Sequence, residues 1–191
     1  TAMSFFGQME YRINDSLTAT LGLAYADDSK DVSGDITIID AFAALPLEAA
    51  GLGVLSGLQF FPAFRNYPNA DEDGKFDSDD VTHTLSLAYA MSDNTSIYAT
   101  HSSGFKATSV NMTVDARDVR AADPEDATNY EIGLKTTFDN GYINLAYFDQ
   151  NIEGFQSNAF SGTGFNLVNA GKESHKGVEL DSMLALSENL M

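Results

Sequence analysis

The chain has 191 residues, no Cys, no Trp, and a formal net charge of −18 from 28 acidic and 10 basic residues. The charge argues against a nucleic-acid partner, because a phosphate backbone must be neutralised by surplus Lys and Arg, and the lack of Cys excludes disulfides and zinc–thiolate sites. With 43% apolar residues, among them 13 Phe and 8 Tyr, the chain as a whole is not disordered.

The acidic residues are concentrated in two stretches that have little hydrophobic periodicity. Residues 27–80 contain twelve acids and residues 106–127 contain five, which together make 17 of the 28. Near-neutral, periodic segments flank both stretches. We expect long loops at about 27–80 and 105–127, on the same side of the molecule.

The first periodic segments predict a β-hairpin. Apolar and polar residues alternate from Phe5 to Ile13 and again from Leu17 to Tyr25. A period of two is typical of strands and not of helices. Asn14-Asp15-Ser16 lies between the two segments, and these residue types favour a tight turn.

The same pattern returns after the first acidic stretch. Residues 81–89 alternate, Ser92-Asp93-Asn94 follows as a turn, and a further strand is predicted at about 95–103. The second acidic stretch then separates this hairpin from the next one.

The remaining segments predict three more strands. Residues 130–138 alternate and are followed by Asp139-Asn140-Gly141, where Asn-Gly is a strong hairpin signal. Strands are then predicted at about 142–156 and 167–184. Residues 157–166 between them are rich in Gly, Ser and Asn and should form a loop.

Tight and long connections alternate along this series of strands. In an up-and-down antiparallel sheet, every tight turn then lies at one end and every long loop at the other, as in transmembrane β-barrels. One apolar and one polar face per strand also fit a half-buried sheet of a soluble protein, so this alternative stays open. Five aromatic residues near strand ends are candidates for an interfacial girdle: Tyr11, Tyr25, Tyr89, Tyr98 and Phe138.

Residues 41–64 are largely apolar and about long enough for a membrane helix. Pro46, Pro62 and several glycines weaken a continuous helix. We expect this segment to be an ordered part of a long loop, with a short helix or an extra hairpin.

Several motifs resemble the barrel strands of TonB-dependent outer-membrane receptors. Ser96–Ala107 resembles the family's "YASYSRGFKAG" strand, and Asp123-Pro124-Glu125 with Asn129–Lys135 resembles "PE…YELGLK". Asn169–Lys172 with Lys176–Leu180 is similar to "NAGK…GVELE", and the opening residues are similar to an earlier hairpin. The motifs occur in the family's order, although His101 replaces an aromatic residue and Ser103 replaces a basic one.

The resemblance implies that residues 1–191 are about seven to eight strands of a larger, 22-stranded barrel. The family's plug domain, TonB-contacting box and C-terminal aromatic strand have no counterpart here, and no signal peptide is visible, so we expect an internal portion of a mature receptor. Two alternatives stay open: a self-contained eight-stranded outer-membrane barrel with a structural or adhesive role, and a soluble acidic all-β binding module.

The resemblance also implies a function. Such receptors lie in the outer membrane of Gram-negative bacteria, among lipid and lipopolysaccharide, and take up scarce ligands, foremost ferric siderophores or other iron complexes. The inner-membrane TonB complex acts on them through the plug. The chain would then supply wall and loops and perform no enzymatic reaction.

No catalytic constellation is apparent in the sequence. His83, His101 and His175 are distributed over three predicted strands without zinc-ligand spacing.

Basic residues in the acidic loops are the candidates for ligand binding: Arg65, Arg117 and Arg120.

One acidic segment approximates the spacing of a calcium-binding loop. Between residues 69 and 80, oxygen-bearing side chains recur at alternating positions around Gly74, although Asn opens the motif and no helices flank it. A solvated acidic loop has the same composition. The candidate Ca²⁺ ligands are Asn69, Asp71, Asp73, Asp77 and Asp80.

Overall fold

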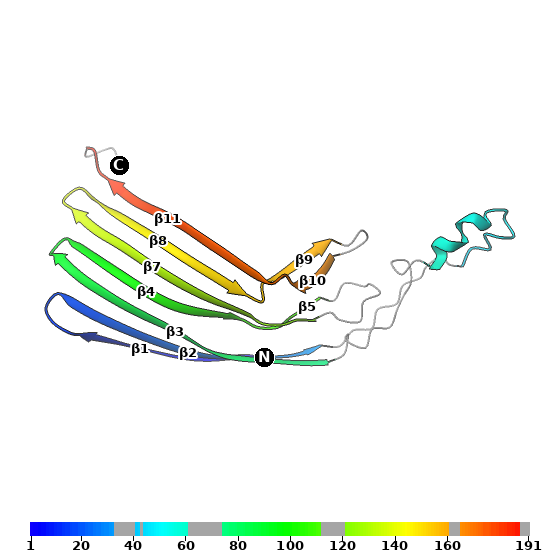
Figure 1. The fold of residues 1–191 in the computed structure, drawn as a ribbon, viewed down its shortest axis with the longest axis horizontal. Helices are drawn as coiled ribbons and strands as arrows, with labels where there is room; N and C mark the ends of the chain where they lie inside the picture. Colours follow the sequence, from blue (N-terminus) through cyan, green and yellow to red (C-terminus); the bar gives the residue numbers. More distant parts are fainter. Residues whose placement is uncertain (33–40, 43, 61–73, 112–120, 161–164, 188–191) are drawn as a thin grey trace.

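The computed structural model describes residues 1–32, 41–42, 44–60, 74–111, 121–160 and 165–187. Its main feature is one antiparallel sheet in which each strand pairs with the next along the chain (Figure 1). This confirms the predicted all-β, up-and-down architecture. The seven strands, in sheet order, are β1 (Ala2–Arg12), β2 (Leu17–Val32), β3 (Gly74–Ser92), β4 (Thr95–Lys106), β7 (Glu125–Phe138), β8 (Gly141–Glu153) and β11 (Lys172–Leu184).

The tight turns lie at one end of the sheet, which we call the turn end, and the long connections lie at the other, the loop end (Figure 1). Between β1 and β2, Asn14 Oδ1 accepts hydrogen bonds from the backbone N–H groups of Ser16 and Leu17, both at 2.9 Å. Asn14 therefore closes the turn with its side chain, as Asn commonly does. The alternation of short and long connections is confirmed.

The β7–β8 hairpin forms where Asn-Gly predicted it, but Gly141 is not a turn residue. Phe138 pairs with Gly141, so Asp139 and Asn140 make the turn. A Cβ atom at Gly141 would lie 1.9 Å from the backbone oxygen of Met183 in β11. Glycine is required here because a neighbouring strand comes close, and not because of a left-handed turn.

The loop of residues 27–80 is shorter than predicted. β2 continues to Val32 and β3 begins at Gly74, so many of the acidic residues lie on paired strands, with Asp27 opposite Asp79. The backbone ladder does not depend on an apolar face, and it continues past the apolar residues. A prediction based on hydrophobicity therefore made both strands too short.

Two small hairpins lie within the other long connections. β5 (Ser109–Val110) pairs with β6 (Ala121–Ala122), and β9 (Gln156–Phe160) pairs with β10 (Phe165–Asn169). The second pair corrects the prediction of a loop at 157–166, since strands enter that segment from both sides. The predicted strand at 167–184 is divided at Gly171, whose φ is 95°.

The apolar segment contains a short 3₁₀ helix, η1 (Gly53–Phe60), which confirms the expected short helix. Gln59 Nε2 donates hydrogen bonds to the backbone oxygens of Phe42 (2.7 Å) and Leu45 (2.8 Å). Leu47 is buried at 5% exposure. Among the described residues no helix has the length and apolar character needed to cross a membrane.

The pairing register sorts the side chains of the sheet into an apolar face and a polar face. A few large apolar residues lie on the polar face as well, among them Phe6, which is 87% exposed, and Phe148. The polar face carries mostly Thr, Ser, Gly and charged residues. The apolar face includes Met3, Phe5, Met9, Tyr11, Leu21, Leu23, Tyr25, Val81, Leu85, Leu87, Tyr89, Ile97, Tyr130, Ile132, Leu134, Phe138, Leu145, Tyr147, Val178 and Leu180.

Candidate functional site

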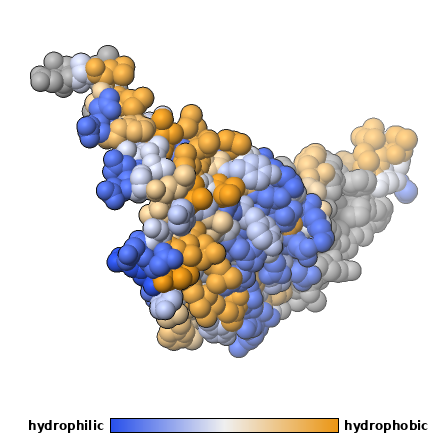
Figure 2. Space-filling model, turned by 60° about the vertical axis from the view of Figure 1, so that its left-hand side comes forward, coloured by the Kyte–Doolittle hydropathy of each residue, from blue (hydrophilic) through white to orange (hydrophobic). Residues whose placement is uncertain are grey.

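The apolar face is not covered by any described part of the chain. Most of its large side chains are exposed. In the part of the chain that the structure describes, the buried apolar residues are Leu47 and Ala122, and neither lies on this face. In Figure 2, hydrophobic residues form patches on the left and centre of the visible surface, with hydrophilic residues between them, and hydrophilic residues predominate to the right of the centre. A soluble half-buried sheet would bury this face against other elements, so the observation favours contact with lipid.

The apolar residues form a band that crosses the sheet diagonally. On β1 the band reaches Met3 near the loop end, whereas on β8 it begins at Tyr147, nearer the turn end. Met9 on β1 is apolar, but the residues at the same level on β8 and β11, reached by following the cross-strand pairs, are charged. They are Asp149 and Lys176, which form an ion pair (2.7 Å). A displacement of roughly eight residues between β1 and β8 corresponds to strands tilted by about 45° from the normal of the band. Tilted strands in a flat bilayer produce this pattern.

The sheet is open. β1 and β11 are its two edges, and neither pairs with the other within the described residues. A self-contained eight-stranded barrel requires pairing between first and last strands, and this pairing is not observed. The sheet instead has the form of a segment of a wider barrel wall.

The polar face carries aromatic rings that lie over glycines of the neighbouring strand. A Cβ atom at Gly133 would come within 2.4 Å of the Tyr98 ring, and one at Gly177 within 2.7 Å of the Phe148 ring. Tyr98 was predicted to belong to the interfacial girdle, but its register with Gly133 places it on the polar face. Alternation alone gave the wrong assignment because an aromatic residue suits either face.

Charged groups on the polar face are partnered across the strands. Tyr98 donates a hydrogen bond to Glu131 Oε1 at 2.6 Å, and Lys135 Nζ lies 5.1 Å from the centre of the Tyr98 ring. Farther along, Asp181 accepts hydrogen bonds from Asn144 Nδ2 (3.2 Å) and Tyr142 (3.4 Å). This face is a polar wall with fixed side chains, able to contact water, a polar ligand or another polar domain.

A second cluster, the loop-end clasp, consists of Lys106, Asp123, Glu125, Gln156 and Asn169. Glu125 Oε1 accepts hydrogen bonds from Lys106 Nζ and from the backbone N–H of Gln156, both at 2.7 Å. Gln156 Nε2 donates to the backbone oxygens of Asp123 (2.8 Å) and Ala107 (3.1 Å). These contacts fasten the β4–β7 connection to the β8–β11 connection.

Asn169 completes the loop-end clasp from the other side. Its Nδ2 donates to the backbone oxygens of Asp123 (2.9 Å) and Gly154 (2.6 Å), and its Oδ1 accepts from the Asp123 N–H (2.8 Å). The family motifs around Glu125 and Asn169 are far apart in sequence but meet here. Each motif was visible in the sequence, whereas their contact was not.

β3 is joined to the same region by a buried hydroxyl pair. Ser78 Oγ donates to Thr108 Oγ1 (2.9 Å) and accepts from the Thr108 backbone N–H (3.2 Å). Both residues are buried. Three neighbouring parts of the loop end are therefore held together by hydrogen bonds.

Glu125 is the charged centre of the loop-end clasp. Burial raises the pKa of its carboxyl group, but the hydrogen bonds from Lys106 and Gln156 and the charge of Lys106 outweigh burial and lower the pKa below its ordinary value. The carboxylate is therefore held in its ionised form, as the acceptor that both donors require.

The predicted ligand-binding arginines, Arg65, Arg117 and Arg120, lie outside the described residues. Of the calcium candidates, Asn69, Asp71 and Asp73 also lie outside them.

Asp77 and Asp80 lie three residues apart in β3, which directs their side chains to opposite faces. Asp77 Oδ1 accepts a hydrogen bond from Ser29 Oγ. In the described part of the chain, no group of three or more His, Asp or Glu residues is arranged to hold a metal ion. The calcium site stays a prediction.

The structure brings together two histidines that the sequence left apart. His83 and His101 lie on adjacent strands of the apolar face, with His83 Nε2 and His101 Nδ1 3.0 Å apart. His175 lies on the polar face beside Glu173, at 3.1 Å. The cross-strand register, which the sequence does not give, decides which histidines meet.

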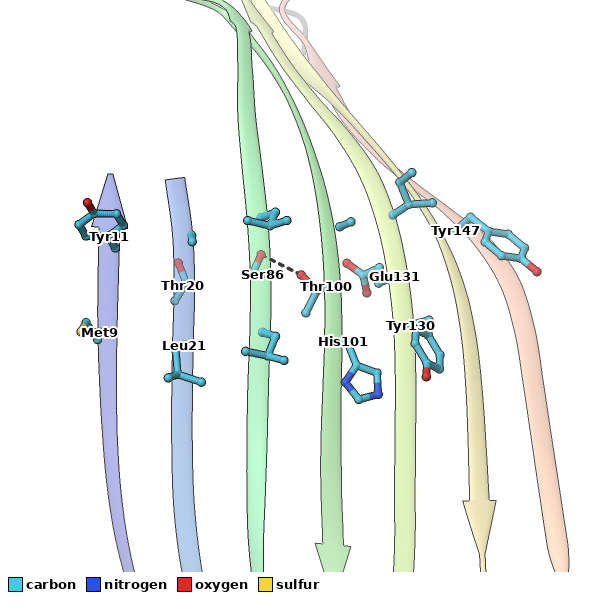
Figure 3. A pocket seen from close by; sticks show the side chains of 15 residues that line it. Met9, Tyr11, Thr20, Leu21, Ser86, Thr100, His101, Tyr130, Glu131 and Tyr147 are labelled. Atoms are coloured by element: carbon cyan, nitrogen blue, oxygen red, sulfur yellow. Dashed lines mark hydrogen bonds between the residues drawn. The ribbon is translucent and has the colours of Figure 1, made fainter. Parts of the chain in front are cut away.

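A hollow of about 680 Å³ lies over the middle of the sheet (Figure 3). Side chains of the apolar face dominate its lining, among them Met9, Leu21, Leu85 and Tyr130. Such a lining suits a hydrocarbon chain and offers few donors to a polar ligand.

Comparison with known proteins agrees with this geometry. The model of the TonB dependent receptor-like β-barrel family matches residues 1–189. Comparison with curated protein sequences gives no significant match.

Three solved structures share the fold at low sequence identity. They are the ferric yersiniabactin uptake receptor FyuA from Yersinia pestis (TM-score 0.67, 16% identity), the copper transporter OprC (0.67, 15%) and the ferric-catecholate import receptor Fiu from K12 E. coli (0.59, 14%). Each covers 98% of this chain, which spans 24%, 27% and 26% of their respective lengths. The chain belongs to the TonB-dependent receptor family and forms part of its β-barrel.

Proposed function

We propose that this chain is part of the wall and loop base of an outer-membrane receptor of a Gram-negative bacterium. The receptor imports a scarce ligand, foremost a ferric siderophore or another iron complex, by energy-dependent transport. The observation that supports this most is the amphipathic sheet whose long connections are gathered and fastened at one end. Two of the similar structures are receptors for ferric complexes, which supports this ligand class.

The two faces have separate roles in this proposal. The apolar band contacts lipid, with lipopolysaccharide next to it at the loop end. The polar wall around Tyr98, Glu131 and Lys135 faces the lumen, where a plug domain acted on by the inner-membrane TonB complex opens the path. Because these side chains are already partnered across strands, the wall keeps its shape while the plug moves.

Ligand capture is assigned to the long connections. Arg65, Arg117 and Arg120 are the proposed contacts to an anionic ferric complex, since guanidinium groups bind carboxylate and catecholate oxygens well. A Ca²⁺ ion held by residues 69–80 would order the first of these connections. Calorimetric titration of the whole receptor with Ca²⁺ tests the second idea, which fails if no binding occurs below a few millimolar.

Radiolabelled uptake in a strain that lacks the receptor gene tests the function. We expect the wild-type gene to restore accumulation of one ⁵⁵Fe-labelled siderophore from a chemically varied panel, and a protonophore to abolish it. The triple variant R65A/R117A/R120A should reach the outer membrane at normal levels but accumulate at least about tenfold less label. Haem, cobalamin and Cu²⁺ belong in the same panel. If no labelled ligand enters in a gene-dependent manner, the proposal is wrong.

A further inference from the structure

We propose that His83 and His101 form a binding site for a first-row transition-metal dication, with Cu²⁺ the best fit, on the outer surface of the barrel. The two imidazoles come from adjacent strands, β3 and β4. Neither lies on the polar wall, so the site is separate from the proposed transport path. It therefore stands independently of the proposed cargo.

The spacing of the two nitrogens matches that of two ligands of one metal ion. His83 Nε2 and His101 Nδ1 are 3.0 Å apart, with ring centroids 4.9 Å apart. With metal–nitrogen bonds of about 2.0–2.1 Å, this separation subtends an angle of about 91–97° at the metal. The angle corresponds to adjacent positions of a square-planar or tetragonal ion, and it is smaller than a tetrahedral Zn²⁺ ion prefers.

Two converging imidazole nitrogens require something between them. In the metal-free pair, a proton on one of the two nitrogens lies between them, so one histidine donates a hydrogen bond to the other. A dication can take the place of this proton when the proton moves to the other nitrogen of the same ring. The imidazole then stays neutral, and the protein releases no proton. Imidazole nitrogens are preferred ligands of Cu²⁺, which also binds most tightly in the divalent series.

Ser103 orients His83 for this role. Its Oγ lies 3.0 Å from His83 Nδ1 and accepts the backbone N–H of His83, also at 3.0 Å. When Nδ1–H donates to Ser103 Oγ, the lone pair of His83 is on Nε2 and faces His101. A hydrogen bond to the second ring nitrogen is the usual way to fix a metal-binding histidine.

Tyr130 supports the other ring and marks the depth of the site. Its ring centroid is 4.5 Å from that of His101, and the residue is 57% exposed at the loop-end margin of the apolar band. This is the level at which aromatic residues meet the membrane surface. Water can therefore fill the remaining coordination positions. The described residues supply two imidazoles to this site, and no carboxylate or third imidazole joins them.

Copper titration of the purified receptor tests the proposal. The protein is prepared in detergent with an affinity tag that lacks histidine, and Cu²⁺ binding is followed by calorimetry and electron paramagnetic resonance. We expect one Cu²⁺ per receptor at this site, with hyperfine coupling to two imidazole nitrogens. His83→Gln and His101→Phe should each weaken binding at least tenfold, and Ser103→Ala severalfold.

The third histidine provides the matched control. His175→Gln should leave the stoichiometry, the affinity and the spectrum unchanged. Heat-modifiable migration of every variant checks that the barrel is folded. Wild-type affinity equal to that of the His83→Gln/His101→Phe double variant, or a spectrum with no imidazole coupling, would overturn the proposal. Tighter binding of Zn²⁺ than of Cu²⁺ would overturn the assignment of the preferred metal.

Discussion

The ring of Tyr98 lies over the backbone of Gly133, its partner on the next strand, so closely that a Cβ atom at position 133 would be 2.4 Å from the ring. The same ring donates its hydroxyl proton to Glu131 and lies 5.1 Å below Lys135 Nζ. One glycine thus makes room for the centre of a polar cluster on the wall.

Replacing Gly133 with Ala should displace this ring and destabilise the barrel by about 1–3 kcal/mol. Urea unfolding of the receptor in detergent measures the effect. Gly7→Ala is the control, because a Cβ atom there meets nothing within 4 Å. The double variant Y98A/G133A should lose less than the sum of the single changes. Strict additivity would show that the ring and the glycine do not interact.

A charge on the apolar face should prevent assembly in the membrane. Leu87 lies within the apolar band, and Arg in its place costs about 2–4 kcal/mol near the bilayer midplane. Leu87→Arg should therefore lower the amount of heat-modifiable receptor in outer-membrane fractions. Thr84→Arg, on the polar face, should have little effect. Equal loss for both variants would contradict the assignment of the faces.

Removing the charge of Glu125 should weaken the loop-end clasp by about 1.5–3 kcal/mol, because its hydrogen bonds involve an ionised group. Glu125→Gln tests this in urea unfolding. The matched control is Glu153→Gln, whose ion pair with Lys172 is largely exposed and should contribute no more than about 1 kcal/mol. A loss at Glu153 as large as at Glu125 would contradict the role given to Glu125.

The same carboxylate predicts how stability depends on pH. Because the folded pKa of Glu125 is lowered, its contribution is present above the unfolded value and is lost as pH falls through the folded pKa. Wild-type stability should decline more steeply than that of Glu125→Gln below about pH 4. Parallel profiles for the two proteins would exclude Glu125 as the source of the decline.

Gly154 should not tolerate a side chain. Its φ is 67°, and a Cβ atom would lie 2.7 Å from the backbone oxygen of Pro124. Gly171 has a φ of 95° but open space around its Cβ position, so Gly171→Ala measures backbone strain alone, about 1–2 kcal/mol. Gly154→Ala should lower the free energy of unfolding by more than Gly171→Ala does. Hydrogen exchange at the Gln156 amide should also become faster.

The sequence predicted the strands, the order of connections and the two faces because each depends on local alternation and turn residues. Strand ends at Val32 and Gly74 were missed because the ladder outlasts the apolar pattern. The assignment of Tyr98 and the pairing of His83 with His101 both depend on register. Register is set by backbone pairing across strands, which one sequence read along the chain does not show.

The loop-end clasp divides each of two long connections, β4–β7 and β8–β11, into a base and a tip. Strand pairing and the hydrogen bonds of Glu125, Gln156 and Asn169 depend on the bases alone. The tips can therefore change in length and composition while the wall beneath them folds in the same way. The same boundary marks where a foreign binding loop could be grafted.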